Sequence, residues 1–204
     1  EQAVQVPGPG VDVGYFQPCP LPDVSGDAPV FLLVARMLRD KGVVEYVEAA
    51  RLLRPRHPQA RFVLLGFLGV ENVSAIHQAQ MDAWVAEGAV EYWGATSDVR
   101  PMIERADCVV LPSYREGMPR TLLEAAAMGR PLVATDVPGC REVVRDGVNG
   151  YLCPAKDAKA LAQSMEKIIQ ASPGLRQRLG EAGRFCVETQ FAERYVIDCY
   201  LRAI

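Results

Sequence analysis

The chain has 204 residues, half of them hydrophobic, and a formal net charge of −3 at pH 7. This length supports one well-cored domain and is short for two. The acidic balance lacks the basic footprint that nucleic-acid binding requires, so no nucleic-acid partner is expected. The six cysteines include no C-x-x-C pair, which indicates reduced thiols in a cytoplasmic protein. The two histidines have no second ligand at helical spacing, so no metal site is expected.

Residues 1–29 are rich in proline and glycine and show little periodicity. We therefore expect this stretch to be a linker or hinge that leaves a preceding domain. No signal peptide is expected at its start, and no apolar run of the sequence approaches the roughly 20 residues that span a bilayer. Residues 30–204 are expected to form the folded domain.

From residue 30 onward, short apolar runs alternate with segments of helical periodicity. Strands are predicted at 30–35, 61–66, 90–94, 107–112, 131–135 and 150–154. Helices are predicted at 43–53, 74–88, 99–106, 120–129, 141–147, 158–171, 174–187 and 192 to the end. This alternation predicts an α/β fold with a doubly wound, Rossmann-like parallel six-stranded sheet in the order 3-2-1-4-5-6.

In such a sheet, ligands bind beyond the carboxyl ends of the strands, where the strand order reverses. The loops after the first and fourth strands flank that point. The first loop, "ARMLRDKGV", places Arg36 at the strand end and Lys41 before the next helix. Two cations here could bind a diphosphate through charge-assisted hydrogen bonds. Alternatively, both are ordinary loop charges, with Lys41 paired to Asp40 or Glu45.

The loop after the fourth strand, "SYREGMPRTLLEAAAMG", combines small residues with a helix start. Gly117 lacks a side chain where a ligand would approach, and Pro119 suits the first helical position. The free amides of Arg120, Thr121 and Leu122 would then face an anion at the positive end of the helix. This loop is therefore a second candidate anion site, opposite the first.

Two carboxylates flank this helix start. Glu116 lies at the mouth of the turn and Glu124 lies inside the helix. Because one carboxylate can accept hydrogen bonds from two hydroxyls, one could bind a sugar and the other a ribose. The alternative is an exposed Glu116 and a Glu124 that pairs with Arg120 one turn earlier.

The stretch "VEYWGATSDV" follows the third strand. Residues 96–98 form a helix N-cap signal before the helix at 99–106. Trp93 could flank a nucleobase, or it could simply belong to the hydrophobic core.

Together these motifs resemble the carboxyl-terminal, donor-binding half of a GT-B glycosyltransferase of family 4, the retaining group that uses sugar nucleotides. The resemblance runs from "GVDVGYF" (10–16), which is similar to the hinge motif of the family, to the end of the chain. Within it, "RMLRDKG" resembles the diphosphate-binding segment. The run "REGMPRTLLEAAAMGRPLVATDVPGCREVVRDGVNGYL" resembles the region in which two glutamates are separated by seven residues, together with the element after it.

The resemblance implies a role for each matching residue, with Arg36, Lys41 and Glu116 as the catalytic set. Arg36 and Lys41 would bind the donor diphosphate, Glu116 the transferred sugar and Glu124 the ribose. The amides of Gly117, Met118, Thr121 and Leu122 would lie along the sugar and phosphates, and the base would lie near Trp93, Gly94 and Ala95. It also implies metal-free catalysis, since no D-x-D motif stands at a strand end.

The narrower likeness is to enzymes that build bacterial surface polysaccharides such as lipopolysaccharide from UDP-sugars. The acceptor, lipid-linked or a saccharide, would bind an amino-terminal domain that this chain lacks, so the chain alone is expected to be inactive. The arginines of 51–61 could contact anionic lipid at the inner face of the membrane, or they could form a solvated helix end.

Two features depart from the family pattern: Ala35 replaces a glycine, and "GFLGVEN" replaces a tight glycine-rich turn after the second strand. Both leave the donor sugar open. The alternative functions are a sugar-nucleotide epimerase, a phosphorylase-like enzyme of the same architecture and a noncatalytic nucleotide-binding module.

Overall fold

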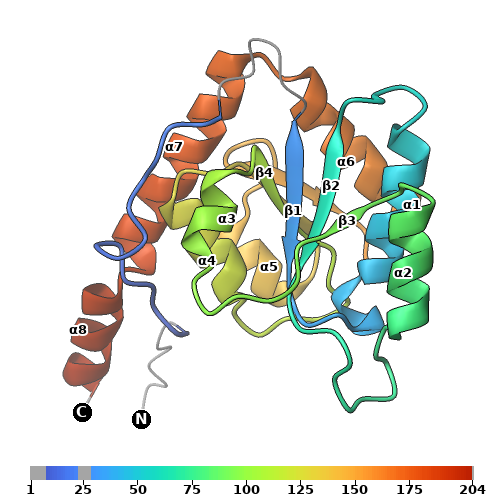
Figure 1. The fold of residues 1–204 in the computed structure, drawn as a ribbon. Coiled ribbons are helices and arrows are strands. Elements are labelled where there is room, and N and C mark those ends of the chain that lie inside the picture. Colours follow the sequence, from blue (N-terminus) through green and yellow to red (C-terminus); the bar gives the residue numbers. More distant parts are fainter. Residues whose placement is uncertain (1–7, 23–28, 204) are drawn as a thin grey trace.

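A computed structural model describes residues 8–22 and 29–203 of the chain. The parts of the predicted hinge at 1–7 and 23–28 lie outside the described residues, as does residue 204. The architecture is a parallel sheet with helices on both faces (Figure 1).

The predicted sheet is confirmed. Its six strands are all paired in parallel and follow the order β3-β2-β1-β4-β5-β6. The strands are β1 (Val30–Val34), β2 (Arg61–Leu65), β3 (Glu91–Tyr92), β4 (Cys108–Leu111), β5 (Leu132–Thr135) and β6 (Gly150–Cys153). The order reverses between β1 and β4, so the loops that follow these two strands lie at the switch point.

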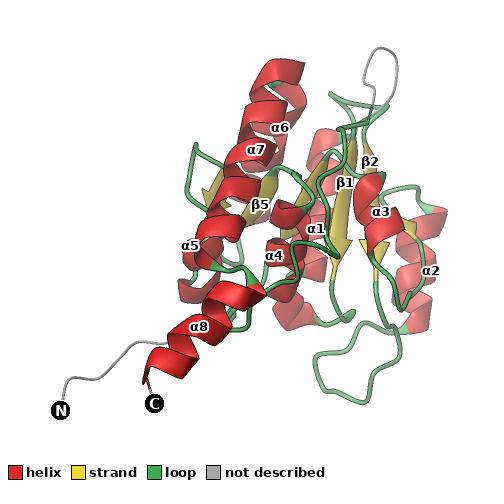
Figure 2. Cartoon of the chain, turned by 90° about the vertical axis from the view of Figure 1, so that its left-hand side faces the viewer, coloured by secondary structure: helices red, strands yellow, loops and turns green. Residues whose placement is uncertain are grey.

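The helices pack as two layers on the sheet, as Figures 1 and 2 show. They are α1 (Val43–Leu53), α2 (Gln78–Ala86), α3 (Arg100–Glu104), α4 (Arg120–Ala127), α5 (Pro138–Val143), α6 (Ala158–Gln170), α7 (Pro173–Gln190) and α8 (Glu193–Ala203), with a short 3₁₀ turn, η1 (Arg39–Lys41), before α1. Helices α1, α2 and α6 share one hydrophobic cluster with the sheet. Helices α3, α4 and α5 share a second cluster with the opposite face.

Burial on both faces explains the apolar strands. Every residue of β4 and of β5 is buried. On the α1 side, Phe31 and Phe62 stack with their ring centroids 5.6 Å apart, and Tyr46 of α1 meets Phe62 edge-on. This core fixes the strand ends that carry the candidate site.

The start of one predicted helix and both ends of another differ most from the prediction. Helix α2 begins at Gln78 instead of residue 74, because residues 74–76 pair with the loop after β1: the Arg39 amide donates to the Ser74 carbonyl at 2.7 Å, and the Ile76 amide donates to the Met37 carbonyl at 2.9 Å. The helix predicted at 141–147 is instead α5, which begins at Pro138 and ends at Val143.

Asn149 explains the end of α5. Its side-chain amide donates to the Val143 carbonyl at 2.8 Å, and its side-chain oxygen accepts from the Arg145 amide at 2.8 Å. These bonds give the last helical carbonyl a partner outside the helix. At α3, the N-cap residue is Val99, which makes no side-chain cap hydrogen bond, so the cap predicted at residues 96–98 is wrong by one residue. The Asp98 carboxylate, just before it, accepts from the amide of Arg100, the first helical residue, at 3.1 Å.

The described part of the hinge segment packs against the helical body. Val11 forms a parallel bridge with Ala192, where its amide donates to the Phe191 carbonyl at 2.8 Å and its carbonyl accepts from the Glu193 amide at 3.0 Å. Val11 and Phe16 are buried in the second cluster. This segment therefore lies against the junction of α7 and α8.

Candidate functional site

The loops after β1 and β4 touch at the carboxyl edge of the sheet. Gly42 adopts a left-handed conformation with φ 72°, and a Cβ there would lie 2.0 Å from the Pro112 carbonyl oxygen. The Tyr114 amide donates to the Asp40 carbonyl at 2.9 Å. Only glycine permits so close an approach in this conformation, so Gly42 sets the distance between the two loops.

The contact brings Lys41 and Glu116 together. Lys41 Nζ lies 2.6 Å from Glu116 Oε1, and the two side chains are 23% and 12% exposed. Glu116 is therefore not the exposed loop residue of the alternative interpretation. The lysine and the glutamate, 75 residues apart in sequence, form the centre of the site.

The other carboxylates considered for Lys41 have different donors. Asp40 accepts from the Ser74 hydroxyl at 3.3 Å. Glu45 accepts from the Tyr114 hydroxyl at 2.7 Å, a second link between α1 and the loop after β4. Burial, and then this hydrogen bond, raise the pKa of Tyr114 to about 12. The tyrosine therefore stays a donor at physiological pH.

Arg36 is exposed at the end of β1, and no hydrogen bond or ion pair joins its guanidinium to another described residue. Its planar fork matches the geometry of phosphate oxygens. Arg36 and Lys41 therefore present two cations at the same loop.

The loop after β4 is held by backbone contacts. A Cβ at Gly139 of α5 would lie 2.3 Å from the Gly117 carbonyl oxygen and 2.5 Å from that of Glu116. In contrast, a Cβ at Gly117 would meet nothing within 4 Å, so this residue faces open space. Gly139 was missed in the sequence, since only the contact itself reveals its role.

The start of α4 differs in part from the prediction. Pro119 precedes the helix instead of opening it. The Leu122 amide donates to the Pro119 carbonyl at 3.1 Å, so the prediction that it is free is wrong. The amides of Arg120 and Thr121 have no acceptor among the described residues. The Thr121 hydroxyl donates to the Val34 carbonyl at 3.3 Å, which fixes the helix start against the end of β1.

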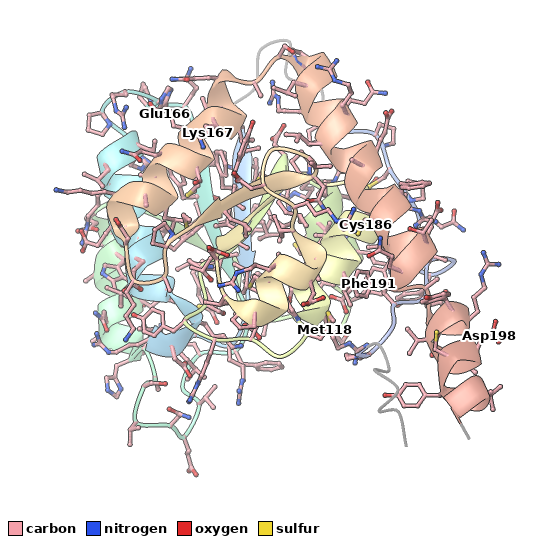
Figure 3. The ribbon with its side chains drawn as sticks, turned by 180° about the vertical axis from the view of Figure 1, so that it is seen from behind. Met118, Glu166, Lys167, Cys186, Phe191 and Asp198 are labelled. Carbon is pink, nitrogen blue, oxygen red and sulfur yellow. The ribbon has the colours of Figure 1, made fainter. Side chains whose placement is uncertain are left out.

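Met118 lies beside these residues at the carboxyl edge (Figure 3). Its side chain packs against the second hydrophobic cluster, and a Cβ at Gly8 would lie 3.1 Å from the Met118 Cβ. Met118 therefore contacts the hinge segment, while its backbone follows the open Gly117.

Glu124 faces a cavity of about 380 Å³. The wall of the cavity comes from α4, the loop before α3 and the hinge segment, and consists of Gly10, Val11, Asp12, Tyr15, Phe16, Ser97, Asp98, Val99, Arg120, Glu124 and Glu193. Arg120 Nε lies 4.0 Å from Glu124 Oε1, which leaves the carboxylate weakly paired. Burial raises the pKa of Glu124, whose side chain is 15% exposed.

Trp93 packs into the body of the domain. Its indole N–H donates to Glu91 at 3.1 Å, and the Arg105 guanidinium lies 4.1 Å from the ring centroid. The ring is partly buried and packs against the second cluster, without being one of its buried members. Gly94, with φ 76°, accepts at its carbonyl from the Gly66 amide at 2.7 Å, and Ala95 is exposed. The backbone of 94–95 therefore lies at the carboxyl edge.

A third cation near the site had no sequence signal. Lys156, in the loop after β6, has a left-handed backbone with φ 61°, and its ammonium lies 4.8 Å from the centre of the Tyr114 ring. Within residues 8–22 and 29–203, no group of three His, Cys, Asp or Glu side chains could hold a metal ion.

Three of the four arginines of the basic stretch pair with carboxylates, and Arg54 donates to the Ala89 carbonyl at 3.4 Å. Arg51 contacts Glu48 and Glu87, and Arg56 contacts Glu166. Arg61 likewise forms an ion pair with Glu91. Most of the positive charge of 51–61 is thus matched locally, as in the helix-end interpretation. Across the helices of the described chain, none is both long enough and apolar enough to cross a membrane.

The sequence of this chain is similar to part of several longer proteins. The chain is 37% identical over 175 residues to the N,N'-diacetylbacillosaminyl-diphospho-undecaprenol alpha-1,3-N-acetylgalactosaminyltransferase of Campylobacter jejuni, covering 85% of this chain and 44% of that protein. It is 32% identical over 182 residues to the lipopolysaccharide core biosynthesis glycosyltransferase LpsE of Rhizobium meliloti, covering 89% of this chain and 51% of the relative. The chain thus spans about half the length of these relatives.

Solved structures agree on the fold. Sucrose-phosphate synthase from Thermosynechococcus elongatus superposes with a TM-score of 0.77 and 28% identity over 92% of this chain and 48% of that one. HepE from Anabaena in complex with UDP superposes with a TM-score of 0.81 and 22% identity over 96% of this chain and 56% of that one. The family model described as glycosyl transferases group 1 matches residues 22–185. Together with the switch-point site, this match establishes that the chain belongs to the glycosyl transferases group 1 family.

Proposed function

We propose that this chain is the donor-binding half of a retaining glycosyltransferase that transfers a sugar from a UDP-sugar to a lipid-linked or saccharide acceptor in polysaccharide biosynthesis. The observation that carries the proposal is the contact of Lys41 with Glu116, 2.6 Å long, at the point where strand order reverses. This contact supports the proposal because an ammonium group suits a diphosphate and a neighbouring carboxylate suits sugar hydroxyls.

The diphosphate binds between the loop after β1 and the start of α4. Arg36 supplies a planar fork and Lys41 a compact charge. The unpaired amides of Arg120 and Thr121 add donors at the positive end of α4. Because an ammonium group has three donors, Lys41 can keep its bond to Glu116 while it binds a phosphate oxygen.

The rest of the donor extends in two directions from the phosphates. The sugar lies over the open Gly117 and the backbone of Met118, with Glu116 as acceptor for its hydroxyls. The ribose lies in the 380 Å³ cavity at Glu124. The nucleobase lies against the backbone of residues 93–95, since the Trp93 ring is covered by Arg105.

During transfer, the bond between the anomeric carbon and the β-phosphate oxygen breaks. The sugar becomes oxocarbenium-like, and the departing diphosphate gains negative charge. Arg36, Lys41 and the Thr121 amide stabilise that charge, and preorganised electrostatics of this kind is usually the largest catalytic contribution. Glu116 orients the sugar without attacking it, and the acceptor enters from the face that the leaving group vacates. The two cations serve in place of a metal ion.

The acceptor binds a domain outside this chain, so the 204-residue chain alone transfers no sugar. The full-length protein works in the cytoplasm, at the inner face of the membrane when its acceptor is lipid-linked. A lipid-linked acceptor would match the diphospho-undecaprenol named for the Campylobacter relative.

Calorimetry with UDP, GDP and ADP tests the donor site directly. We expect one-to-one binding, tightest for UDP and unchanged by a chelator. A folded sample that binds none of the three at millimolar concentration would contradict the proposal. Product analysis with the full-length protein then separates transfer from epimerisation, since only transfer consumes an acceptor.

A further inference from the structure

A second, larger cavity of about 890 Å³ lies at the opposite, amino-terminal edge of the sheet. Its walls are the hinge stretch 18–22, which runs beside α7 in Figure 1, and α7 itself. Asp107, directly before β4, and Gly129, after α4, complete the lining. Ligand sites are typically clefts of roughly 300–1,000 Å³ with mostly apolar walls and a few polar groups, and this cavity has both features.

Arg176 of α7 is the polar group of interest in the wall. Its side chain is 9% exposed, and its Nη1 meets Asp107 Oδ1 only at the long distance of 3.5 Å. Its Nε is buried with no partner among the described residues. A guanidinium has five N–H donors, so most of the hydrogen-bonding capacity of Arg176 is unused.

Arg130 lies behind this wall and is fully buried. Its Nη2 donates to the Pro20 carbonyl at 2.9 Å and to the Glu104 carbonyl at 3.2 Å, and it also lies 2.7 Å from Cys19 Sγ. Its Nε and Nη1 have no partner in the described chain. Within this cluster, two buried guanidinium groups therefore face the single carboxylate of Asp107.

This imbalance is unfavourable, because a buried charge costs free energy unless it is paired and hydrogen-bonded. Asp107 offers limited compensation: its Oδ2 is already used by the Val30 amide at 2.8 Å, and burial raises the pKa of its carboxyl. An anion in the cavity would supply both the missing negative charge and acceptors for the unused donors of Arg176.

The other polar residues of the wall pair with one another on α7: Arg184 Nε lies 2.6 Å from Glu188 Oε1, and the Gln177 amide donates to Glu181 Oε1 at 2.8 Å. The rest of the wall is apolar. Phe185 stands at the rim with 68% of its surface exposed, and Leu21 lies on the facing hinge stretch. Proline side chains from the hinge stretch and from the start of α7 also line the cavity: Pro18, Pro20, Pro22 and Pro173. Such walls favour a hydrocarbon body over another polar group.

We propose that this cavity binds an organic anion, with a carboxylate or phosphate head at Arg176 and an apolar body between Leu21 and Phe185. The site is separate from the donor site, which lies at the carboxyl edge and requires a nucleotide. The proposal of an anion site can therefore be tested independently of the proposed glycosyl transfer.

Titration of the 204-residue chain with octyl phosphate, octanoate and neutral octanol, followed by calorimetry and by amide NMR shifts on α7, tests this site. The two anions distinguish a phosphate head from a carboxylate head. We expect at least one of them to bind one-to-one, at least about tenfold more tightly than octanol, because charge-assisted hydrogen bonds are the stronger kind. Saturating UDP should not change this affinity. Equal binding of octanol, or no binding of either anion at millimolar concentration, would overturn the proposal.

Two matched variants locate the binding. Phe185→Asp introduces a charge at the rim that repels an anion and removes apolar contact, and we expect a loss of affinity of about tenfold or more. Leu201→Asp introduces the same negative charge in place of an equally exposed apolar residue of α8 (67%), and it should leave the affinity for the anion unchanged. Because both side chains are exposed, neither variant should unfold the chain. Equal affinity of the two variants would sink the assignment, as would NMR shifts that avoid α7.

Discussion

Charged side chains are paired differently at the two edges of the sheet. At the carboxyl edge, Lys41 and Glu116 form a close one-to-one pair that remains partly open to solvent. At the amino edge, Arg130 is fully buried and Arg176 is 9% exposed in the wall of the cavity, and both guanidinium groups have donors left over. Figure 3 shows how far apart the two ends are, with Met118 near the first and Glu166 on α6 near the second.

The edges also differ in what holds them. Backbone contacts that require Gly42 and Gly139 set the geometry of the carboxyl edge. At the amino edge, the contacts of the Arg130 side chain with Cys19 and Pro20 set the position of the hinge stretch. We infer that the carboxyl edge keeps its shape without a ligand, as a site for a charged transition state needs.

The largest effect is expected from adding one methyl group at the carboxyl edge. Gly139→Ala would place its Cβ 2.3 Å from the Gly117 carbonyl oxygen, and backbone cannot move aside cheaply. We expect a loss of about 1–3 kcal/mol in the free energy of unfolding, measured by urea denaturation. The matched change at the amino edge, Gly174→Ala, meets only the Arg178 guanidinium at 3.8 Å and should be neutral or stabilising. Equal losses of unfolding free energy in both variants would show that the two edges do not differ in how closely their backbones pack.

The next effect concerns ligand affinity. Lys41→Ala should weaken UDP binding by about 1.5–3 kcal/mol in calorimetry, since a hydrogen bond to a charged phosphate is lost, while the affinity for uridine should hardly change. Lys167→Ala, in the last turn of α6, removes the same side chain far from the donor site and serves as the control. If Lys167→Ala weakened UDP binding as much as Lys41→Ala, long-range charge and not a local contact would be responsible.

A smaller effect is expected where the two loops are tied together. Tyr114→Phe removes the donor to Glu45 Oε1, and Glu45 Oε2 is already buried without a partner. We expect a loss of about 1–2 kcal/mol in unfolding free energy, because the carboxylate is left unsatisfied. UDP affinity should fall with it, since this bond helps to fix the position of α1 next to Lys41. An unchanged affinity would show that Gly42 alone positions the loop.

The smallest effects are pH-dependent and opposite in sign at the two edges. Burial raises the pKa of Glu124, so its contribution to stability is present below its unfolded pKa and is lost as pH rises through the folded pKa. Glu124→Gln should therefore stabilise the fold at neutral pH, with the gain disappearing in acid. The same variant should weaken UDP binding, because the ribose loses its carboxylate.

Glu166 provides the opposite case. Hydrogen bonds from His57 and then Arg56 lower its pKa, so its contribution is present above the unfolded pKa and is lost as pH falls through the folded pKa. Glu166→Gln should destabilise the fold at neutral pH and have no effect on UDP affinity. Urea midpoints between pH 3 and pH 8 measure both variants, and curves of the same sign would show that burial does not separate the two glutamates.

Most of the fold could be predicted from the sequence, because apolar runs and helical periodicity alternate and right-handed crossovers then fix the strand order. What failed depended on distant partners. Residues 74–76 carry a helical pattern, yet their backbone pairs with the loop after β1. The end of α5 is set by the side chain of Asn149, six residues beyond Val143.

The site shows the same limit. Arg36, Lys41, Glu116 and Glu124 could be named because they follow the strands that flank the switch point. The direct contact between Lys41 and Glu116 could not, since it depends on the approach of two loops through Gly42. For Trp93, a strand position alone does not tell which way a large ring lies, and the ring packs beneath Arg105.

The bridge between Val11 and Ala192 joins stretches that are far apart along the chain. Because the Val11 and Glu193 amides both depend on it, they should exchange their hydrogens for deuterium together, through a single opening event. A rotation of the start of α8 would then move the hinge segment directly, without a rearrangement of the sheet.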